Sequence, residues 1–337
     1  MKILPQGRSA WVQLSFRWAI VLGLLVVVIA YMIWMPGKSY VGSLQTLSPE
    51  EEEIRANSRK HVSVLSATIG PRNTIQYKAL QDAARYIEQT LNHFGYQVES
   101  KTYEVQGRSV RNLISTIPGG SRASEIVVIG AHYDTVLDTP GADDNASGVA
   151  ALLELARILK RTHPARTVRL VAFVNEEPPF FQTASMGSWV YAKQVRRLNE
   201  NIVASVSLET IGVYSDERGS QHYPVGLNLL YPAKGNFIGF VGNIPSRGLV
   251  QEMLRSFRDT TFFPSEGIAA PEWIAGIGWS DQWSFWQEHY PGVMVTDTAP
   301  FRNPNYHSPT DQAETLDYDR MARVINGLVK VAISLGR

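Results

Sequence analysis

Hydrophobic and polar positions along the chain recur at two spacings that predict strands and helices. Segments with the pattern of strands, several of them nearly continuous apolar runs, occupy residues 96–104, 109–117, 125–131, 167–174, 202–208, 226–231, 236–241 and 292–297. Apolar residues spaced as in amphipathic helices recur over residues 77–94, 146–161, 187–198, 246–257 and 318–334. A further helix is expected to begin at Ser48, the predicted N-cap. Strands that alternate with helices predict an α/β fold, a mixed and largely parallel central sheet with helices on both faces.

A separate apolar segment lies near the N-terminus. Residues 18–34 carry no charge, and as a helix they would extend about 26 Å, close to the roughly 30 Å hydrocarbon core of a bilayer. Three basic residues precede the segment, and no acidic residue occurs before Glu50; the basic residues are Lys2, Arg8 and Arg17. The positive-inside rule then predicts a cytoplasmic N-terminus at 1–17, one transmembrane helix at 18–35, and an extracytoplasmic remainder.

A cleaved signal peptide is the alternative interpretation of this segment, because Val28-Ile29-Ala30 is a passable cleavage site. The apolar run continues past that site, and it is longer than the usual core of a signal peptide. These two features favour an uncleaved single-pass anchor in the cell membrane. A buried core helix fits less well, because the segment has no polar face.

Composition and charge narrow the classes of function. The 337 residues are 44% hydrophobic, and the formal net charge is only +1. A charge so nearly balanced provides no electrostatic footprint for nucleic acid, so we expect no nucleic-acid partner. The chain has no cysteine, which excludes disulfides and thiolate metal sites. Histidine, aspartate and glutamate remain as the strong metal ligands.

Four predicted strands are each followed by side chains that can bind a metal ion or move a proton. These are His132, Asp134 and Asp144 after the first strand, Glu176 and Glu177 after the second, Glu209 at the third, and His307 and Asp311 after the last. Each alone has an ordinary explanation, such as a helix N-cap or a solvated turn. In open α/β sheets, however, ligand sites lie beyond the carboxyl ends of the strands. The ordinary explanations would have to hold independently at four strand ends on one edge of the sheet. A functional site explains all four together, and we therefore favour it.

The residue types at this edge suit a pair of zinc ions. Two imidazoles and three carboxylates provide N and O ligands, and one carboxylate must bridge if the ions lie about 3.5–4 Å apart. Asp144 is the natural bridge, because its tight, glycine-flanked loop can present both oxygens. Two Zn²⁺, three ionised carboxylates, two neutral imidazoles and one hydroxide sum to zero charge. We therefore expect two Zn²⁺ per chain and a water that acts as nucleophile.

The motifs GAHYDT, GADDNASG, NEE, SLET and NPNYHSPTD resemble, in this order, the five motifs of the co-catalytic zinc exopeptidase family. Secreted bacterial aminopeptidases and glutamate carboxypeptidase belong to that family, and glutaminyl cyclase is a relative. The resemblance covers residues 76–337, which we expect to form a metallopeptidase catalytic domain. Residues 36–75 are expected to form a linker and a leading helix between the anchor and this domain.

The resemblance also implies a role for each motif residue. It implies two metal sites that share one carboxylate, the first formed by His132, Asp144 and Glu209, and the second by Asp144, Glu177 and His307. Glu176 would be the general base on the bridging water, and Asp134 would orient His132 from behind. A cis peptide bond between Asp144 and Asn145 is implied as well.

This sequence departs from the family pattern at two positions. Glu209 stands where aspartate is more frequent, so one extra methylene must be absorbed by the position of the backbone. Gln282, in WSDQWSFW, stands where histidine is usual.

The direction of attack on a peptide is predicted from the charges near the motifs. A free α-amine needs acceptors, and the site segments provide them in Asp143, Glu176 and Asp281. A C-terminal carboxylate needs arginine, and only Arg302 lies close to a motif. Aromatic residues at 180–181 and 273–286 would favour an apolar first residue. We therefore expect an aminopeptidase that removes apolar N-terminal residues from peptides.

Three other functions are compatible with much of this pattern. A zinc carboxypeptidase would use the same metal ligands. A single-zinc glutaminyl cyclase would retain most of them, but the Asp143-Asp144-Asn145 turn resembles the two-metal form of this loop. A non-catalytic ectodomain of the same fold would be expected to lose ligands, whereas this chain retains all five and the base.

Overall fold

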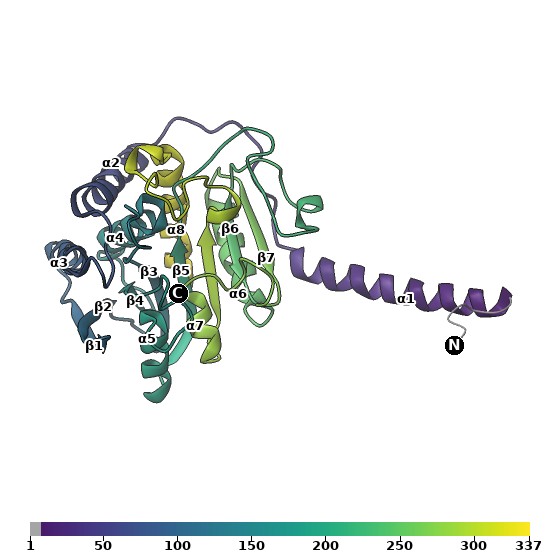
Figure 1. The fold of residues 1–337 in the computed structure, drawn as a ribbon, viewed down its shortest axis with the longest axis horizontal. Helices are drawn as coiled ribbons and strands as arrows, with labels where there is room; N and C mark the ends of the chain where they lie inside the picture. The colour runs from purple at the N-terminus through teal and green to yellow at the C-terminus, as the bar shows by residue number, and fades with distance from the viewer. Residues whose placement is uncertain (1–7) are drawn as a thin grey trace.

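The computed structural model describes residues 8–337; Lys2 and the rest of residues 1–7, part of the expected cytoplasmic segment, lie outside the described residues. Figure 1 shows a central sheet flanked by helices, with one long helix that projects away from this body. The helices are α1 (Arg8–Ile33), α2 (Pro49–Val62), α3 (Tyr77–His93), α4 (Gly148–Leu159), α5 (Gly187–Arg197), α6 (Arg247–Thr260), α7 (Gln282–Gln287) and α8 (Tyr318–Leu335). The strands are β1 (Glu99–Val105), β2 (Arg108–Ile117), β3 (Arg122–His132), β4 (Arg166–Phe173), β5 (Asn201–Glu209), β6 (Ile238–Gly242), β7 (Ser265–Ala269) and β8 (Gly292–Thr296).

The eight strands form one mixed sheet in the order β1-β2-β4-β3-β5-β8-β6-β7. The four central strands, β4, β3, β5 and β8, run parallel to one another, and β7 runs parallel to β6. The pairs β1–β2, β2–β4 and β6–β8 are antiparallel. The sequence-based prediction of a mixed, largely parallel sheet is confirmed. The parallel centre explains why its strands are apolar throughout, since both of their faces are covered.

Helices cover both faces of the sheet, as the sequence predicted. On one face α3, α4, α6 and α8 bury a large apolar cluster, and α2 packs on the outside of α4 and α8. On the other face α5 and α7 pack over the centre of the sheet. Beyond α7, which packs against β5 and β8, the outer strands β6 and β7 are covered on this second face by loops and the last turn of α1, and this difference leaves room for a cavity.

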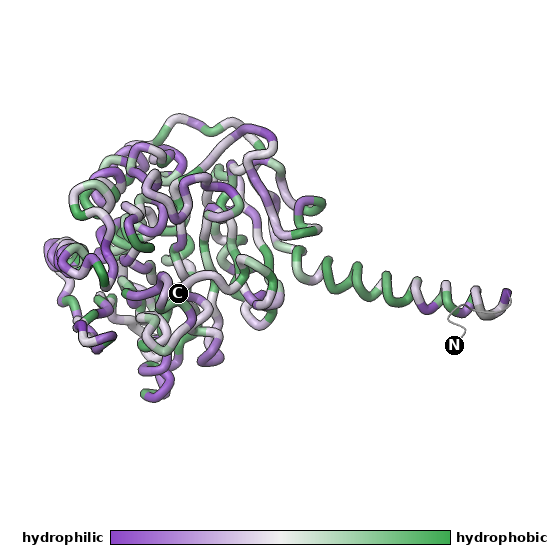
Figure 2. Tube along the Cα trace, in the orientation of Figure 1, coloured by the Kyte–Doolittle hydropathy of each residue, from purple (hydrophilic) through white to green (hydrophobic). Residues whose placement is uncertain are grey.

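Helix α1 is the one helix among residues 8–337 that is long and apolar enough to cross a membrane, and residues 11–33 meet this test by length and composition. A signal sequence near an N-terminus would meet the same test. Most of α1 is free of contact with the body, and its apolar stretch stands out in Figure 2. Its last turn docks at the edge of the sheet, where Met32 is buried and Arg247 donates a hydrogen bond to the carbonyl oxygen of Tyr31 at 2.7 Å.

The predicted helix start at Ser48 is confirmed by a reciprocal pair of hydrogen bonds. The Glu51 N–H donates to Ser48 Oγ at 3.2 Å, and the Ser48 N–H donates to Glu51 Oε2 at 2.8 Å. The arrangement satisfies two of the backbone donors that a helix start leaves free. Local sequence was sufficient for this prediction, because the cap involves residues only three positions apart.

The predicted strand at 226–231 is wrong. This segment is a surface loop with a short 3-10 turn at Leu227–Leu229, and Gly226 has a φ of +92° that no strand contains. Pro224 also removes a backbone donor just before the apolar run. After residue 200 the structure has four strands, as many as were predicted, but β7 takes the place of the predicted strand at 226–231. The sequence of β7, SEGIA, is too short and too polar to be recognised from its pattern. Helix α7 was not predicted either.

Candidate metal centre

The site lies where the four parallel strands end. His132 is the last residue of β3, Glu209 is the last residue of β5, and Glu176 and Glu177 follow β4 by three and four positions. His307 lies in the loop after β8. Because these strands are neighbours and parallel, their carboxyl ends meet at one edge, and the fold brings together all eight residues that the sequence singled out.

Asp144 lies at the centre of this group. Its Oδ1 atom is 3.2 Å from Nε2 of His132, and its Oδ2 atom is 3.0 Å from Nε2 of His307. The Nε2 atom of His132 is also 3.3 Å from Glu209, and that of His307 is 3.3 Å from Glu177. The two carboxylate oxygens of Asp144 therefore face two different imidazoles, each of which has a second carboxylate beside it.

These contacts define groups of donor atoms that could hold a metal ion. In each group the donor atoms all lie within 4.8 Å of one another; the groups are His132, Asp144 and Glu209, then Asp144, Glu177 and His307, and also His132, Glu176 and Glu177. The first two are the two ligand sets that the family resemblance implied. They share Asp144 and no other residue.

Without a bound cation, the buried carboxylates of this centre are difficult to ionise. Burial raises the pKa of Glu177 to about 8, and burial, with the negative charges of Glu209 and Glu177 close by, raises the pKa of Glu176 well above its usual range. Burial alone would also raise the pKa of Asp144, but the imidazoles of His132 and His307 hold it below its usual range. So many buried carboxylates can ionise together only beside cationic charge.

The donor atoms fit divalent metal ions of the zinc type. Nε2 of His132 and Oε1 of Glu177, two atoms of the possible ligand groups, are buried without a hydrogen-bond partner among the described residues. Buried polar atoms are nearly always paired, so unpaired atoms on residues that meet at one centre indicate a bound ion. A set of imidazole nitrogens and carboxylate oxygens is the donor chemistry that zinc accepts.

Asp134 holds in place the segment after β4 that carries Glu176 and Glu177. Its Oδ1 accepts the backbone N–H of Glu176 and its Oδ2 accepts that of Glu177, both at 3.1 Å. Oδ1 also lies 3.5 Å from Nδ1 of His132, on the side of the ring away from Asp144. The sequence predicted the contact with His132, whereas the two backbone contacts appear only in the tertiary structure.

The loop that carries Asp144 is held by hydrogen bonds from distant parts of the chain. The carboxylate of Asp311 accepts the backbone N–H groups of Asp143 and Asp144, at 3.0 Å and 3.1 Å. The Asn145 side chain donates to the Leu208 carbonyl at 2.9 Å and accepts the Thr210 N–H at 3.1 Å. The Asp144–Asn145 peptide bond is cis, as the resemblance implied.

Two supporting residues were missed by the sequence reasoning. Arg72 is completely buried and donates to the carbonyl oxygens of Tyr133, Pro140 and Gly141 at 2.7, 2.6 and 2.9 Å, so it joins the two ends of the loop that leads from β3 to Asp144. Ser280 Oγ donates to Oε2 of Glu209 at 2.6 Å. No local pattern marks an arginine at position 72 or a serine at 280, because their partners are remote in sequence.

The sequence offered Asp143 and Asp281 as acceptors for a substrate's α-amine, and Arg302 as a donor to a substrate's carboxylate. The structure gives these three residues different surroundings. Asp143 is buried and already accepts hydrogen bonds from Gly212 and Asn303, so it is not free to bind an amine. Asp281 is buried, neither of its oxygens has a hydrogen-bond partner among residues 8–337, and burial raises its pKa to about 7. Arg302 is buried as well, donates to Gln221 and Val213, and is thereby removed from the role of carboxylate anchor.

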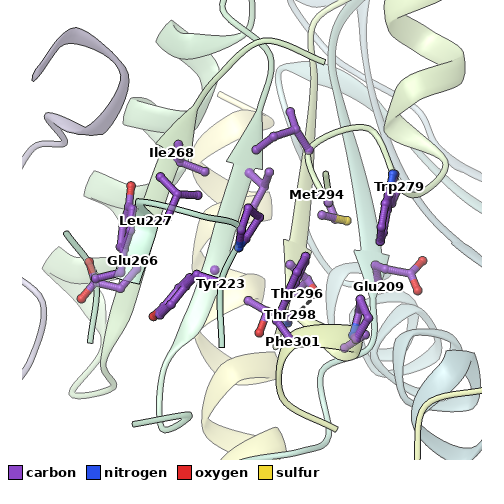
Figure 3. Close-up of a pocket in the computed structure, with 18 of the residues that line it drawn as sticks. Glu209, Tyr223, Leu227, Glu266, Ile268, Trp279, Met294, Thr296, Thr298 and Phe301 are labelled. Carbon is purple, nitrogen blue, oxygen red and sulfur yellow. Dashed lines mark hydrogen bonds between the residues drawn. The ribbon is translucent and has the colours of Figure 1, made fainter. Parts of the chain in front are cut away.

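The expected aromatic wall is only partly formed. Trp279 lines a cavity that reaches Glu209, as Figure 3 shows. Trp286 belongs to the core at 5% exposure, and Trp273 is 84% exposed. Phe180 is buried in the main apolar cluster. The segment 273–286 thus supplies both core and cavity, and 180–181 does not line the cavity.

Comparison with known proteins agrees with this geometry. The family model of peptidase family M28 matches residues 112–332. The chain is 36% identical over 315 residues to the uncharacterized protein YfbL of Escherichia coli K12, covering 91% of this chain and 94% of that protein. The structure of BSAP, a zinc aminopeptidase from Bacillus subtilis, superposes with a TM-score of 0.64 at 15% identity and covers 82% of this chain and 93% of its own.

The same fold occurs in a protein of different activity. The glutaminyl cyclase of Bacteroides thetaiotaomicron has a TM-score of 0.62 at 16% identity, covering 86% of this chain and 99% of that one. At such identities the two structures establish the fold alone, whereas the family match covers most of the chain and all five motifs singled out above. The chain belongs to peptidase family M28 and is a metallo-exopeptidase, as its sequence predicted.

Proposed function

We propose that this protein is a two-zinc aminopeptidase that releases apolar N-terminal residues from peptides. The observation that carries the proposal is the position of Asp144, whose two oxygens face His132 and His307 at 3.2 and 3.0 Å. A carboxylate placed in this way can be shared by two ions. His132, Asp144 and Glu209 would hold one ion, and Asp144, Glu177 and His307 would hold the other. When bound, the ions would polarise the scissile carbonyl and lower the pKa of the attacking water.

Glu176 is the residue proposed to move protons. It is the one glutamate of the centre that belongs to neither of the two ligand sets sharing Asp144, and its Oε2 lies 4.0 Å from Nε2 of His132. Its carboxylate would accept a proton from the attacking water and pass it to the nitrogen of the leaving amine. Asp134 would fix both the backbone of Glu176 and the ring of His132. It would thereby hold the proposed base, Glu176, at a constant position relative to the proposed ligand His132.

The amino end of the substrate is favoured over the carboxyl end. The arginine that a C-terminal carboxylate would need is absent from the described surroundings of the centre, because Arg302 is bound within the protein. Asp281, by contrast, is a buried acceptor with no hydrogen-bond partner in the described part of the chain. The apolar cavity beside Glu209 is suited to the side chain of the first residue.

We also propose that α1 is an uncleaved anchor and that the catalytic domain lies outside the cytoplasmic membrane. Arg8 and Arg17 lie at the end of the helix remote from the body, where the positive-inside rule places the cytoplasm. The last turn docks on the folded body through buried contacts, which supports an anchor that is retained. The domain boundary near residue 75 stays a prediction.

The test is a comparison of blocked and free substrates with the full-length protein in lipid nanodiscs. We expect metal analysis to give two zinc ions per chain and leucyl-anilide to be cleaved. Acetylation of the amino group should abolish cleavage, and amidation of a peptide's carboxyl end should not. If acetylated peptides are cut as fast as free ones while amidation blocks the reaction, the enzyme works from the carboxyl end. Cyclisation of N-terminal glutamine without hydrolysis would instead identify a glutaminyl cyclase.

A further inference from the structure

An apolar cavity extends from the metal centre across the sheet to its edge. Its accessible volume is about 100 Å³, or about 800 Å³ when all empty space up to the open solvent is counted, and it begins at Glu209 of β5. Its floor is formed in turn by Met294 of β8, Val241 of β6 and Ile268 of β7, and Gly239 of β6 adds no side chain to the floor. Figure 3 shows Glu209 at one end of this row and Ile268 at the other.

The length of the floor follows from the order of the strands. The sequence β5-β8-β6-β7 contains three steps between neighbouring strands, and each step is about 4.8 Å, so the cavity spans about 14 Å. That distance equals about four residues of fully extended chain. The side chain of one ordinary residue would fill only the end near Glu209.

The lining shows what kind of group would fill the remainder. The roof is formed by loops that contribute Leu227, Tyr231, Ile277 and Phe301. The floor is the face of a sheet whose backbone groups are already paired between strands. A peptide placed here would bury N–H and C=O groups with few partners, at a cost of several kcal/mol. A hydrocarbon chain has no such groups and would gain from burial alone.

One charged residue lies at the far end of the cavity. The side chain of Glu266, on the edge strand β7, is 23% exposed and lies 3.8 Å from Arg258. Its charge is therefore paired and partly in water at the open side. The path between Glu209 and Leu227 remains apolar apart from the hydroxyl groups of threonine and tyrosine.

The far end of the cavity adjoins the proposed membrane anchor. Met32, in the last turn of α1, packs in one apolar cluster with Val241, Ile268 and Met294 of the cavity floor, and Leu227 packs against this cluster. The guanidinium of Arg247 lies 4.1 Å from the centre of the Tyr31 ring at the same place. The cavity thus connects the metal centre with the part of the body nearest to the membrane.

We propose that the natural substrates are amphiphilic, with a first residue that carries a long hydrocarbon chain, and that this chain lies in the cavity between Glu209 and Leu227. The inference rests on the proposed aminopeptidase activity and names the substrate class of that site. Hydrolysis breaks the first peptide bond, adds the hydroxyl of water to the carbonyl carbon, and adds a proton to the leaving amine. The polar remainder of the substrate stays at the open side of the metal centre.

The test varies the length of one side chain. Anilides of leucine, norleucine and the straight-chain 2-amino acids with eight, ten and twelve carbons are compared with the full-length protein in nanodiscs, because detergent could itself enter the cavity. Each buried methylene should raise kcat/KM about fourfold until the chain reaches Leu227. A kcat/KM that stops rising at norleucine would overturn the proposal.

Partition of long chains into the nanodisc also depends on length, so a matched pair of variants is needed. Leu227→Trp should fill the far end of the cavity, and Leu229→Trp changes a residue of the same turn that is 84% exposed and outside the cavity. Partition of the substrates into the nanodisc is the same for both variants. In the first variant, the ratio of kcat/KM on the ten-carbon and twelve-carbon substrates to kcat/KM on leucyl-anilide should fall at least tenfold, and in the second this ratio should match the wild type.

The outcomes separate the two proposals. Cleavage of leucyl-anilide by Leu227→Trp shows that the variant is folded, so an equal response of both variants to long chains would overturn the cavity proposal alone. If no aminoacyl anilide of any length is cleaved by the zinc-loaded wild type, the aminopeptidase proposal itself is wrong.

Discussion

The carboxylate of Asp134 accepts a hydrogen bond from the backbone N–H of Glu176 at 3.1 Å. This contact joins the ends of two parallel strands, β3 and β4, at the point where each delivers a functional side chain. It holds the backbone at Glu176 without any contribution from a metal ion. The proposed base and the proposed metal ligands should therefore be separable by mutation.

The first prediction concerns the adjacent glutamates. Glu176→Gln should retain both zinc ions, because Glu176 belongs to neither ligand set that shares Asp144, and should lower kcat by at least about 10²-fold through loss of the base. Glu177→Gln should lose zinc. Metal analysis and kcat on leucyl-anilide measure the two effects. Exchanged phenotypes would show that the roles of these neighbours are reversed.

The second prediction concerns the shared carboxylate. Asp144→Asn should lose both zinc ions, because an amide offers one oxygen of low charge to two sites. Asp138→Asn, an exposed residue of the same segment, is the matched control and should keep its metal and its activity. Zinc content per chain after dialysis is the measurement. A variant at position 144 that retains one full equivalent would show that the carboxylate does not bridge.

The third prediction concerns Arg72. Replacement by Met would leave the carbonyl groups of Tyr133, Pro140 and Gly141 without their donor, and each unpaired buried group costs about 1–3 kcal/mol. We expect Arg72→Met to lower the free energy of unfolding by roughly 3 kcal/mol or more. Arg85→Met, at an exposed arginine on α3, is the control. The measurement is the free energy of unfolding of the two variants in denaturant. Equal values would show that the hydrogen bonds of Arg72 do not stabilise the loop.

The fourth prediction is a pH dependence away from the metal centre. Burial, with the positive charges of Lys60 and Arg157 nearby, lowers the pKa of His61 to about 4. The unfolded chain, with a histidine pKa of about 6.5, binds this proton more readily than the folded chain. Stability from His61 is thus complete above pH 6.5 and declines by at most about 1.4 kcal/mol per unit as the pH falls towards 4.

His61→Gln provides the comparison, because glutamine is neutral throughout this range and can still reach the hydroxyl of Tyr86, which lies 2.7 Å from Nδ1 of His61. The difference in unfolding free energy between wild type and variant should decrease from pH 6.5 to 4 and be constant above. A difference that is flat across this window would show that His61 has an ordinary pKa in the folded protein.

The fifth prediction concerns topology. If α1 is an uncleaved anchor with its N-terminus in the cytoplasm, protease added to intact spheroplasts should release a soluble fragment of nearly the full length. Cleavage is expected in the exposed linker that follows the anchor, near residues 41–47. Protection of the protein in intact spheroplasts, with digestion after lysis, would reverse the orientation.

Local sequence determined most of the elements and the set of site residues. The cap at Ser48 involves a residue three positions away, and the ligand motifs follow directly from the ends of apolar strands. Such features depend on spacing along the chain, so they can be recognised before the fold is known. The segment 226–231 failed because its apolar residues serve as loop and cavity roof, a role that hydrophobic pattern cannot distinguish from a strand.

Only the tertiary structure decided how these residues are held and what lies beside them. Arg72 supports a loop about 70 residues away in sequence, and no local pattern marks it. Asp311 belongs to a motif that the sequence singled out, but its hydrogen bonds to a loop about 170 residues away appear only in the tertiary structure. Arg302, which the sequence offered as a carboxylate anchor, proved to be buried among protein partners. The cavity exists because loops and the last turn of α1, and no full helix, cover the outer strands β6 and β7 on this face. Its length is set by the order of strands in the sheet, which is fixed by long-range pairing and not by any one segment of the sequence.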